Sequence, residues 1–165
     1  MALTTGRIKA DITLVETITA NIGASAADAV ITHKMTLDQT VPNGTSVPAT
    51  IAASFSQSLT SSTAYTDMTA LPKANGATAD CTGLKLQSIM IKNPTGNGTM
   101  TLAHNTSTSV SAYNFIGTAG SIAIPAGGAV LLYLPEAAAD VSSSAKNIIW
   151  AGTGTQSAHV EIVAG

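Results

Sequence analysis

The sequence predicts an all-β protein: an antiparallel β-sandwich, jelly-roll-like, with an extended N-terminal arm. Three observations predict this fold class. Charged residues make up only 10% of the 165 residues, against about 25% in an ordinary globular chain, so the Lys- and Glu-rich surface of a helical protein is missing. Apolar and polar residues alternate in several segments, as in half-buried strands. Turns rich in Gly and Pro follow at short intervals.

The opening segment, residues 1–22, is expected to be either an extended arm or the first strand of the sandwich. Residues 23–165 are expected to form the sandwich domain itself, because the chain is too short for two ordinary domains. Apolar residues stand at every second position near the start: Ile8, Ala10, Ile12 and Leu14. This alternation predicts a strand with one apolar face.

The next region gives weaker signals. Val30–Leu37 is rich in β-branched residues, and Asn43-Gly44 predicts a turn. Further on, three apolar residues are spaced by four: Ile51, Phe55 and Leu59. That spacing suits one face of a helix, but the surrounding Ser and Thr residues favour a strand, which is the preferred interpretation.

The second half of the chain is more clearly patterned. A loop at Lys73–Thr82 separates it from the first half, and three pairs of short strands follow, each joined by a turn with Gly or Pro. We interpret each pair as a hairpin. The predicted hairpins are Leu84–Ile91 with Thr99–Leu102, Ile122–Ile124 with Val130–Leu134, and Asn147–Trp150 with His159–Val163.

Charge argues for self-association and against nucleic acid. Seven basic residues balance nine acidic ones, for a net charge of −2, and the basic residues are scattered rather than clustered as phosphate binding requires. So small a net charge gives little repulsion between copies. We therefore expect a homo-oligomer.

Other features place the chain inside the cell where it is made. No apolar run reaches the roughly 18 residues of a membrane span, and the first residues do not resemble a secretory signal. We expect no membrane association and a soluble product inside the cell.

The sequence offers little material for catalysis. Three isolated His residues and one Cys show no zinc-ligand spacing and no nucleophile motif. Cys81 follows Asp80, whose charge would raise rather than lower the pKa of the thiol. We expect no enzyme activity, no metal and no cofactor. Trp150, the single Trp, ends an apolar run, where a core or subunit-interface position is favoured over a sugar-stacking one.

The order of elements in the C-terminal half is more specific than any one of them. It runs through a strand, a Lys92-Asn93 turn, a strand, an Ile124-Pro125 turn with Gly127-Gly128, an apolar strand, and a closing Glu161-Ile-Val segment. This order resembles a group of tailed-bacteriophage virion proteins. The resemblance covers about half of the chain, and the same turn-and-strand order recurs in tail, spike and capsid-decoration proteins.

The resemblance implies a jelly-roll-like decoration, or cement, protein that binds and stabilises the major capsid protein lattice of a phage head, often as a trimer. The expected location is then the capsid surface of the virion. The residues predicted at the capsid or subunit interface are Ile8, Ile12, Leu14 and Trp150. The alternatives are a tail, spike or fibre protein and, more remotely, a carbohydrate-binding or adhesin β-module.

Overall fold

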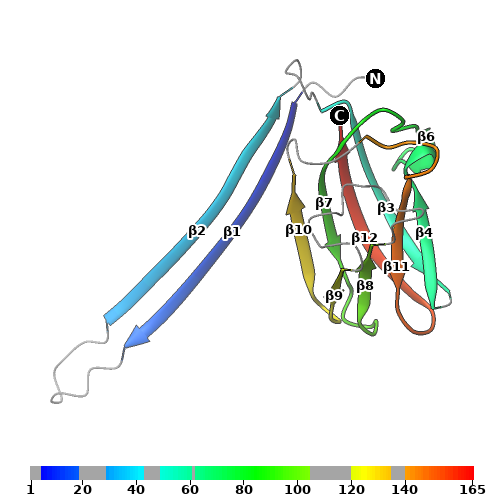
Figure 1. Cartoon of the computed structure of the whole chain (residues 1–165). Coiled ribbons are helices and arrows are strands. Elements are labelled where there is room, and N and C mark those ends of the chain that lie inside the picture. The colour runs from blue at the N-terminus through cyan, green and yellow to red at the C-terminus, as the bar shows by residue number, and fades with distance from the viewer. Residues whose placement is uncertain (1–4, 19–28, 43–48, 61, 105–119, 135–139) are drawn as a thin grey trace, which may run out of the picture.

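The computed structural model describes residues 5–18, 29–42, 49–60, 62–104, 120–134 and 140–165. These residues form a two-layer β-sandwich from which a long two-stranded hairpin projects (Figure 1). Their ladders between strands are all antiparallel. The predicted all-β antiparallel sandwich is confirmed.

Two four-stranded sheets build the sandwich. The first contains, in spatial order, β10 (Ala129–Tyr133), β7 (Leu86–Lys92), β12 (Gln156–Ala164) and β3 (Ile51–Leu59). The second contains β4 (Thr63–Asp67), β11 (Asn147–Ala151), β8 (Met100–Ala103) and β9 (Ser121–Ile124). A single 3-10 turn, η1 (Met68–Ala70), and a small ladder of β5 (Leu71–Pro72) with β6 (Thr78–Ala79) lie near one end.

The pairing of these strands is that of a jelly roll. Within the sandwich the outermost strands in sequence pair first, β3 with β12, and the pairing continues inward as β4 with β11, β7 with β10 and β8 with β9. Such nested pairs fold over into two sheets of four strands. The jelly-roll-like class predicted from the sequence is thus the observed one.

The three predicted hairpins are wrong, although each contains two real strands. In every case the two strands belong to opposite sheets: β7 and β8, β9 and β10, and β11 and β12. The Gly- and Pro-containing turns do reverse the chain. Each reversal crosses between layers about 10 Å apart, and the hydrogen-bonding partner is a distant strand instead of the preceding one.

Two asparagine side chains hold the crossing between β7 and β8. Asn93 is fully buried, and its Nδ2 donates to the carbonyl oxygens of Gly98 and Ile124, both at 2.9 Å. Asn97 Nδ2 donates to the Asn93 Oδ1 at 2.7 Å and to the Ser157 carbonyl at 2.8 Å. Amide side chains therefore satisfy backbone groups that a hairpin ladder would otherwise have paired.

The remaining local predictions have mixed outcomes. The segment with apolar residues spaced by four is strand β3, so the preference for a strand over a helix is confirmed. The loop at Lys73–Thr82 contains β6, and Lys73 N donates to the Ala77 carbonyl at 2.9 Å. The predicted turn at Asn43-Gly44 lies outside the described residues.

The core lies between the two sheets and is built by period-two burial. In β12 every second residue from Gln156 to Ala164 is buried, as expected for a strand with one face inward. Trp150 is fully buried, and its Nε1 donates to the Thr66 hydroxyl at 2.9 Å. The other large, fully buried side chains are Leu59, Met68, Leu71, Leu86, Ile89, Ile91, Met100, Leu102, Ile148 and Ile162.

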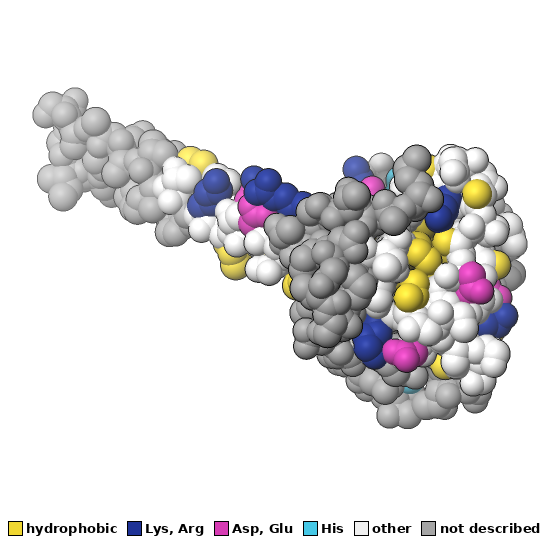
Figure 2. Space-filling view, turned by 90° about the horizontal axis from the view of Figure 1, so that it is seen from above, with side chains coloured by type: hydrophobic (Ala, Val, Ile, Leu, Met, Phe, Trp, Pro, Cys, Tyr) yellow, Lys and Arg dark blue, Asp and Glu magenta, His cyan; other side chains and the backbone are white. Residues whose placement is uncertain are grey.

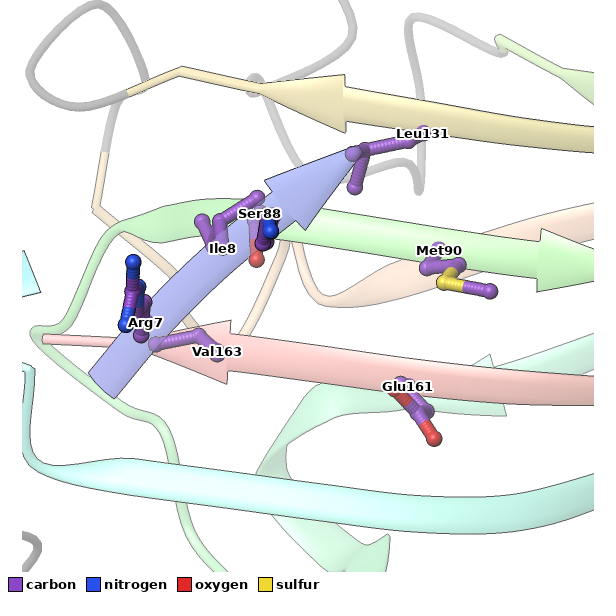
Figure 3. Close-up of a pocket in the computed structure, with 8 residues that line it drawn as sticks. Arg7, Ile8, Ser88, Met90, Leu131, Glu161 and Val163 are labelled. Atoms are coloured by element: carbon purple, nitrogen blue, oxygen red, sulfur yellow. The ribbon is translucent and has the colours of Figure 1, made fainter. Parts of the chain in front are cut away.

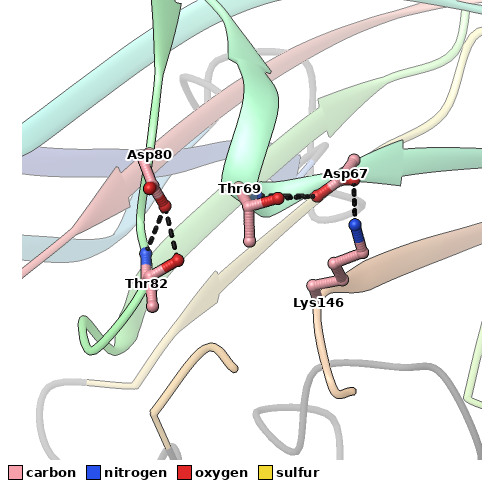
Figure 4. Close-up of polar contacts among 5 residues, drawn as sticks. All are labelled: Asp67, Thr69, Asp80, Thr82 and Lys146. Atoms are coloured by element: carbon pink, nitrogen blue, oxygen red, sulfur yellow. Dashed lines mark hydrogen bonds and ion pairs between the residues drawn. The ribbon is translucent and has the colours of Figure 1, made fainter. Parts of the chain in front are cut away.

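A polar cluster fastens the end of the sandwich where η1 begins (Figure 4). Asp67 caps η1 by accepting from the Thr69 N–H at 2.8 Å, and it pairs with the Lys146 Nζ at 2.5 Å. Nearby, Asp80 accepts from the N–H and hydroxyl of Thr82. Partial burial raises the pKa of Asp67, but the bonds from Lys146 and Thr69 outweigh it and the net pKa is lowered.

Replacing Asn93 by Ala should destabilise the protein by about 1–3 kcal/mol, because the buried carbonyl of Ile124 and the part-buried carbonyl of Gly98 lose their donor. Denaturant unfolding measures this. The matched control is Asn75→Ala, since the Asn75 side chain makes an exposed bond to the Ala77 N–H and its loss should cost less than about 1 kcal/mol. Equal costs at the two positions would contradict the assigned role of Asn93.

Acid should weaken the polar cluster in a defined direction. A carboxyl with a lowered folded pKa contributes stability above its unfolded pKa, near about 4, and that contribution is lost as the pH falls through the folded pKa. Denaturant unfolding at neutral pH and near pH 3 should therefore show a smaller loss of stability in Asp67→Asn than in the unsubstituted protein. An unchanged pH dependence in the variant would count against Asp67 as a contributor.

Candidate interaction surface

The projecting hairpin is the feature of the fold that a self-contained sandwich does not need. β1 (Thr5–Ile18) pairs with β2 (Ala29–Pro42) in one uninterrupted antiparallel register, from Thr5 opposite Pro42 to Ile18 opposite Ala29. Fourteen residues of strand extend about 45 Å at the usual rise. In Figure 1 most of this length lies beyond the sandwich. We call residues 5–18 and 29–42 the arm.

One side of the arm is apolar. Directly opposed residues share a face of an antiparallel ladder, and the register sets Ala10 opposite Leu37 and Ile12 opposite Met35. Together with Leu14 these four residues form what we call the apolar face. Ile12, Leu14 and Met35 are 53%, 62% and 66% exposed, so most of this face is uncovered.

The other side of the arm carries charges that pair among themselves. Arg7 binds Asp38 through Nε at 2.7 Å and through a second, shorter contact, and Lys9 Nζ lies 3.0 Å from Asp11. Hydrogen bonds from Lys9 and then Thr36 lower the pKa of Asp11. Figure 2 shows acidic and basic side chains side by side on the arm. We call this side the polar face; exposed ion pairs of this kind add little stability.

The base of the arm rests on the outside of the first sheet. Ile8 is 8% exposed and belongs to a small second cluster with Ala49, packed by Leu131, Val163 and other half-buried residues. Figure 3 shows β1 crossing β7 and β12 here. A hollow of about 160 Å³ adjoins this contact and includes Met90 and Glu161 in its lining. The apolar face is therefore covered at its base and uncovered beyond the sheet.

Exposed large hydrophobic side chains concentrate on the arm. Within the described part of the chain, six such side chains are exposed, and four belong to the arm: Ile12, Leu14 and Met35 on the apolar face, and Val15 on the polar face. The other two, Tyr65 and Met90, lie on opposite sheets of the sandwich. A concentration of this kind marks a surface that is covered in the working state of a protein.

The four predicted interface residues separate into three environments. Ile12 and Leu14 lie exposed on the apolar face. Ile8 is buried against the body of the same chain. Trp150 lies in the sandwich core, and its ring has no exposed area. The predicted interface position of Trp150 is therefore wrong, and the core position is the observed one.

The arm extends beyond residue 22, the limit predicted from the sequence. Val30–Leu37, expected in the sandwich, lies within β2 and pairs with β1, and the sandwich strands begin at Ile51. The sequence did not predict that Met35, which is exposed, and Leu37, which is half-buried near the base, belong to the arm. Their alternation with Lys34, Thr36 and Asp38 was a usable signal, but it could not say which strand they faced.

The described side chains that could act in catalysis or bind a metal are dispersed over the fold. Burial, followed by the charge of Asp80, raises the pKa of the Cys81 thiol to about 11, so its reactive thiolate is suppressed at neutral pH. His159 lies on β12 of the first sheet, and His104 directly follows β8 of the second sheet. Among the described residues, no three His, Cys, Asp or Glu side chains gather as metal ligands. In the same residues no helix is long and apolar enough to cross a membrane.

Comparisons with protein-family models, with curated proteins and with solved structures find no match. The candidate site therefore rests on the geometry of this chain alone.

Proposed function

We propose that the chain is a structural virion protein that decorates the head of a tailed bacteriophage and cements its major capsid protein lattice. The observation that carries the proposal is the arm, which holds an uncovered apolar face well away from a closed jelly-roll body. Such a face suits a protein whose partners are supplied by an assembly.

The body and the arm divide the work. The jelly roll is a rigid unit with few charges, suited to resting on a repeated surface of major capsid protein. The arm reaches from one body toward its neighbours, so that contacts at many equivalent positions add up although each is weak. The C-terminal resemblance to phage virion proteins supports the same assignment.

The burial of the aromatic rings disfavours the carbohydrate-binding alternative. A sugar platform needs exposed aromatic rings, but Trp150 is buried and Tyr133 is half-buried. Tyr65 is the exposed aromatic side chain that the described residues offer. A tail, spike or fibre role uses the same architecture and is separated from decoration by experiment.

The test uses phage particles produced by the genome that encodes this chain. Quantitative mass spectrometry and cryo-electron microscopy should find the chain on heads, at a copy number set by the lattice. Heads that lack it should release DNA at a lower temperature, and adding the purified chain should restore protection. Finding it on tails would replace the decoration proposal with the tail or spike alternative, and absence from particles would reject both.

Matched variants test the part played by the arm. Deleting residues 1–22 would leave β2 without its partner, so substitutions are preferable. Ile12→Lys charges the apolar face, whereas Thr36→Lys adds the same charge to the polar face one position along the ladder. In the add-back experiment Thr36→Lys should protect heads like the unsubstituted chain, and Ile12→Lys should protect them less. Equal protection by both would remove the arm from the mechanism.

A further inference from the structure

At its base the apolar side of the arm is packed against the sheet, whereas the rest of that side has no such layer against it. Ile8 lies on the same side of β1 as Ile12 and Leu14, because these residues are separated by even numbers. Against the sheet this side is packed by Leu131 and Val163. Farther out the sheet ends, the side chains remain apolar, and exposure rises to 62% at Leu14.

An isolated two-stranded hairpin is marginally stable in water and needs a further layer on its apolar side. The arm's ion pairs do not supply that layer, since they lie on the polar face and are exposed. The missing layer must therefore come from outside the chain's own sandwich.

We propose that the layer is the arm of a second copy of this chain, packed apolar face to apolar face. Where side chains are described, between residues 8 and 14 and residues 35 and 39, this side of the arm carries no charge. Over this stretch two such faces can meet without desolvating an ion, whereas a charged surface would lose hydration on the same contact.

The polar face favours the same orientation. Four of its charged groups pair, Arg7 with Asp38 and Lys9 with Asp11, and Lys34 leaves this face with a surplus positive charge that is best kept in water. When apolar faces stack, these polar faces point outward on both sides and stay hydrated. The net charge of −2 opposes the approach of a second copy only weakly, and self-complementary surfaces are the usual basis of homo-oligomers.

Among the surfaces that a second copy offers, its arm is also the best match for the apolar face. The sandwich's own exposed large hydrophobics, Tyr65 and Met90, stand on different sheets and form no stripe. On the arm, by contrast, Ile12, Leu14 and Met35 lie together on one face, with Met35 directly opposite Ile12. The partner surface with the same length and chemistry is thus the equivalent arm.

Sedimentation velocity of the purified full-length chain, over a range of concentrations, tests the proposal. The unsubstituted chain should self-associate reversibly. Ile12→Lys and Met35→Lys should each weaken association by about tenfold or more, because each inserts a charge into a dry contact. Thr36→Lys should associate like the unsubstituted chain. Circular dichroism checks that all variants keep the β fold, and two variants on opposite strands guard against a local folding defect.

Three results would overturn the proposal. The unsubstituted chain could stay monomeric up to about 100 μM, where even weak association is visible. Ile12→Lys and Met35→Lys could associate as tightly as Thr36→Lys, which would place the contact elsewhere. All three could weaken association equally, which would make it an effect of charge alone. Because no capsid is present, failure here would leave the decoration proposal standing, and the reverse also holds.

Discussion

The contact of Ile8 with the outside of the first sheet determines where the arm leaves the body. Leu131 and Val163 cover one side of β1 at this point, and the register with β2 then carries the same side outward for the rest of the hairpin. The uncovered apolar face, the outward charged face and the need for a second layer all follow from that junction. If the base packed elsewhere, the face would be differently placed or already covered.

The body owes its form to pairings between distant segments. β3 and β12 form the longest ladder of the sandwich, from Ile51 opposite Ala164 to Leu59 opposite Gln156, and they bring the two ends of the sandwich sequence together. Each turn between them only has to reverse the chain and cross the core. Asn93 shows how such a crossing is stabilised, since its amide serves backbone carbonyls from two separate segments.

The strands of this protein are more predictable from its sequence than their hydrogen-bonding partners are. Alternation is a local property, so β12 and β1 could be predicted from their own residues. The choice of a partner strand is not a local property. The turn sequence at Pro125 is equally compatible with a next strand in the same sheet and with one in the opposite sheet, so the predicted hairpins were wrong. Ile12 and Leu14 were found by alternation. For Trp150 the sequence left a core position and an interface position open, because burial depends on which side of β11 faces the opposite sheet; the core position is the observed one.

Amide hydrogen exchange in the arm, measured at low and high protein concentration, tests the central claim most directly. The account predicts that amides in residues 5–18 and 29–42 exchange quickly when copies are apart and more slowly when they associate, because the arm gains its missing layer. Amides of β7 and β12 in the closed sandwich should exchange slowly at both concentrations. Arm amides that exchange at the same rate at every concentration, while the protein self-associates, would contradict the account.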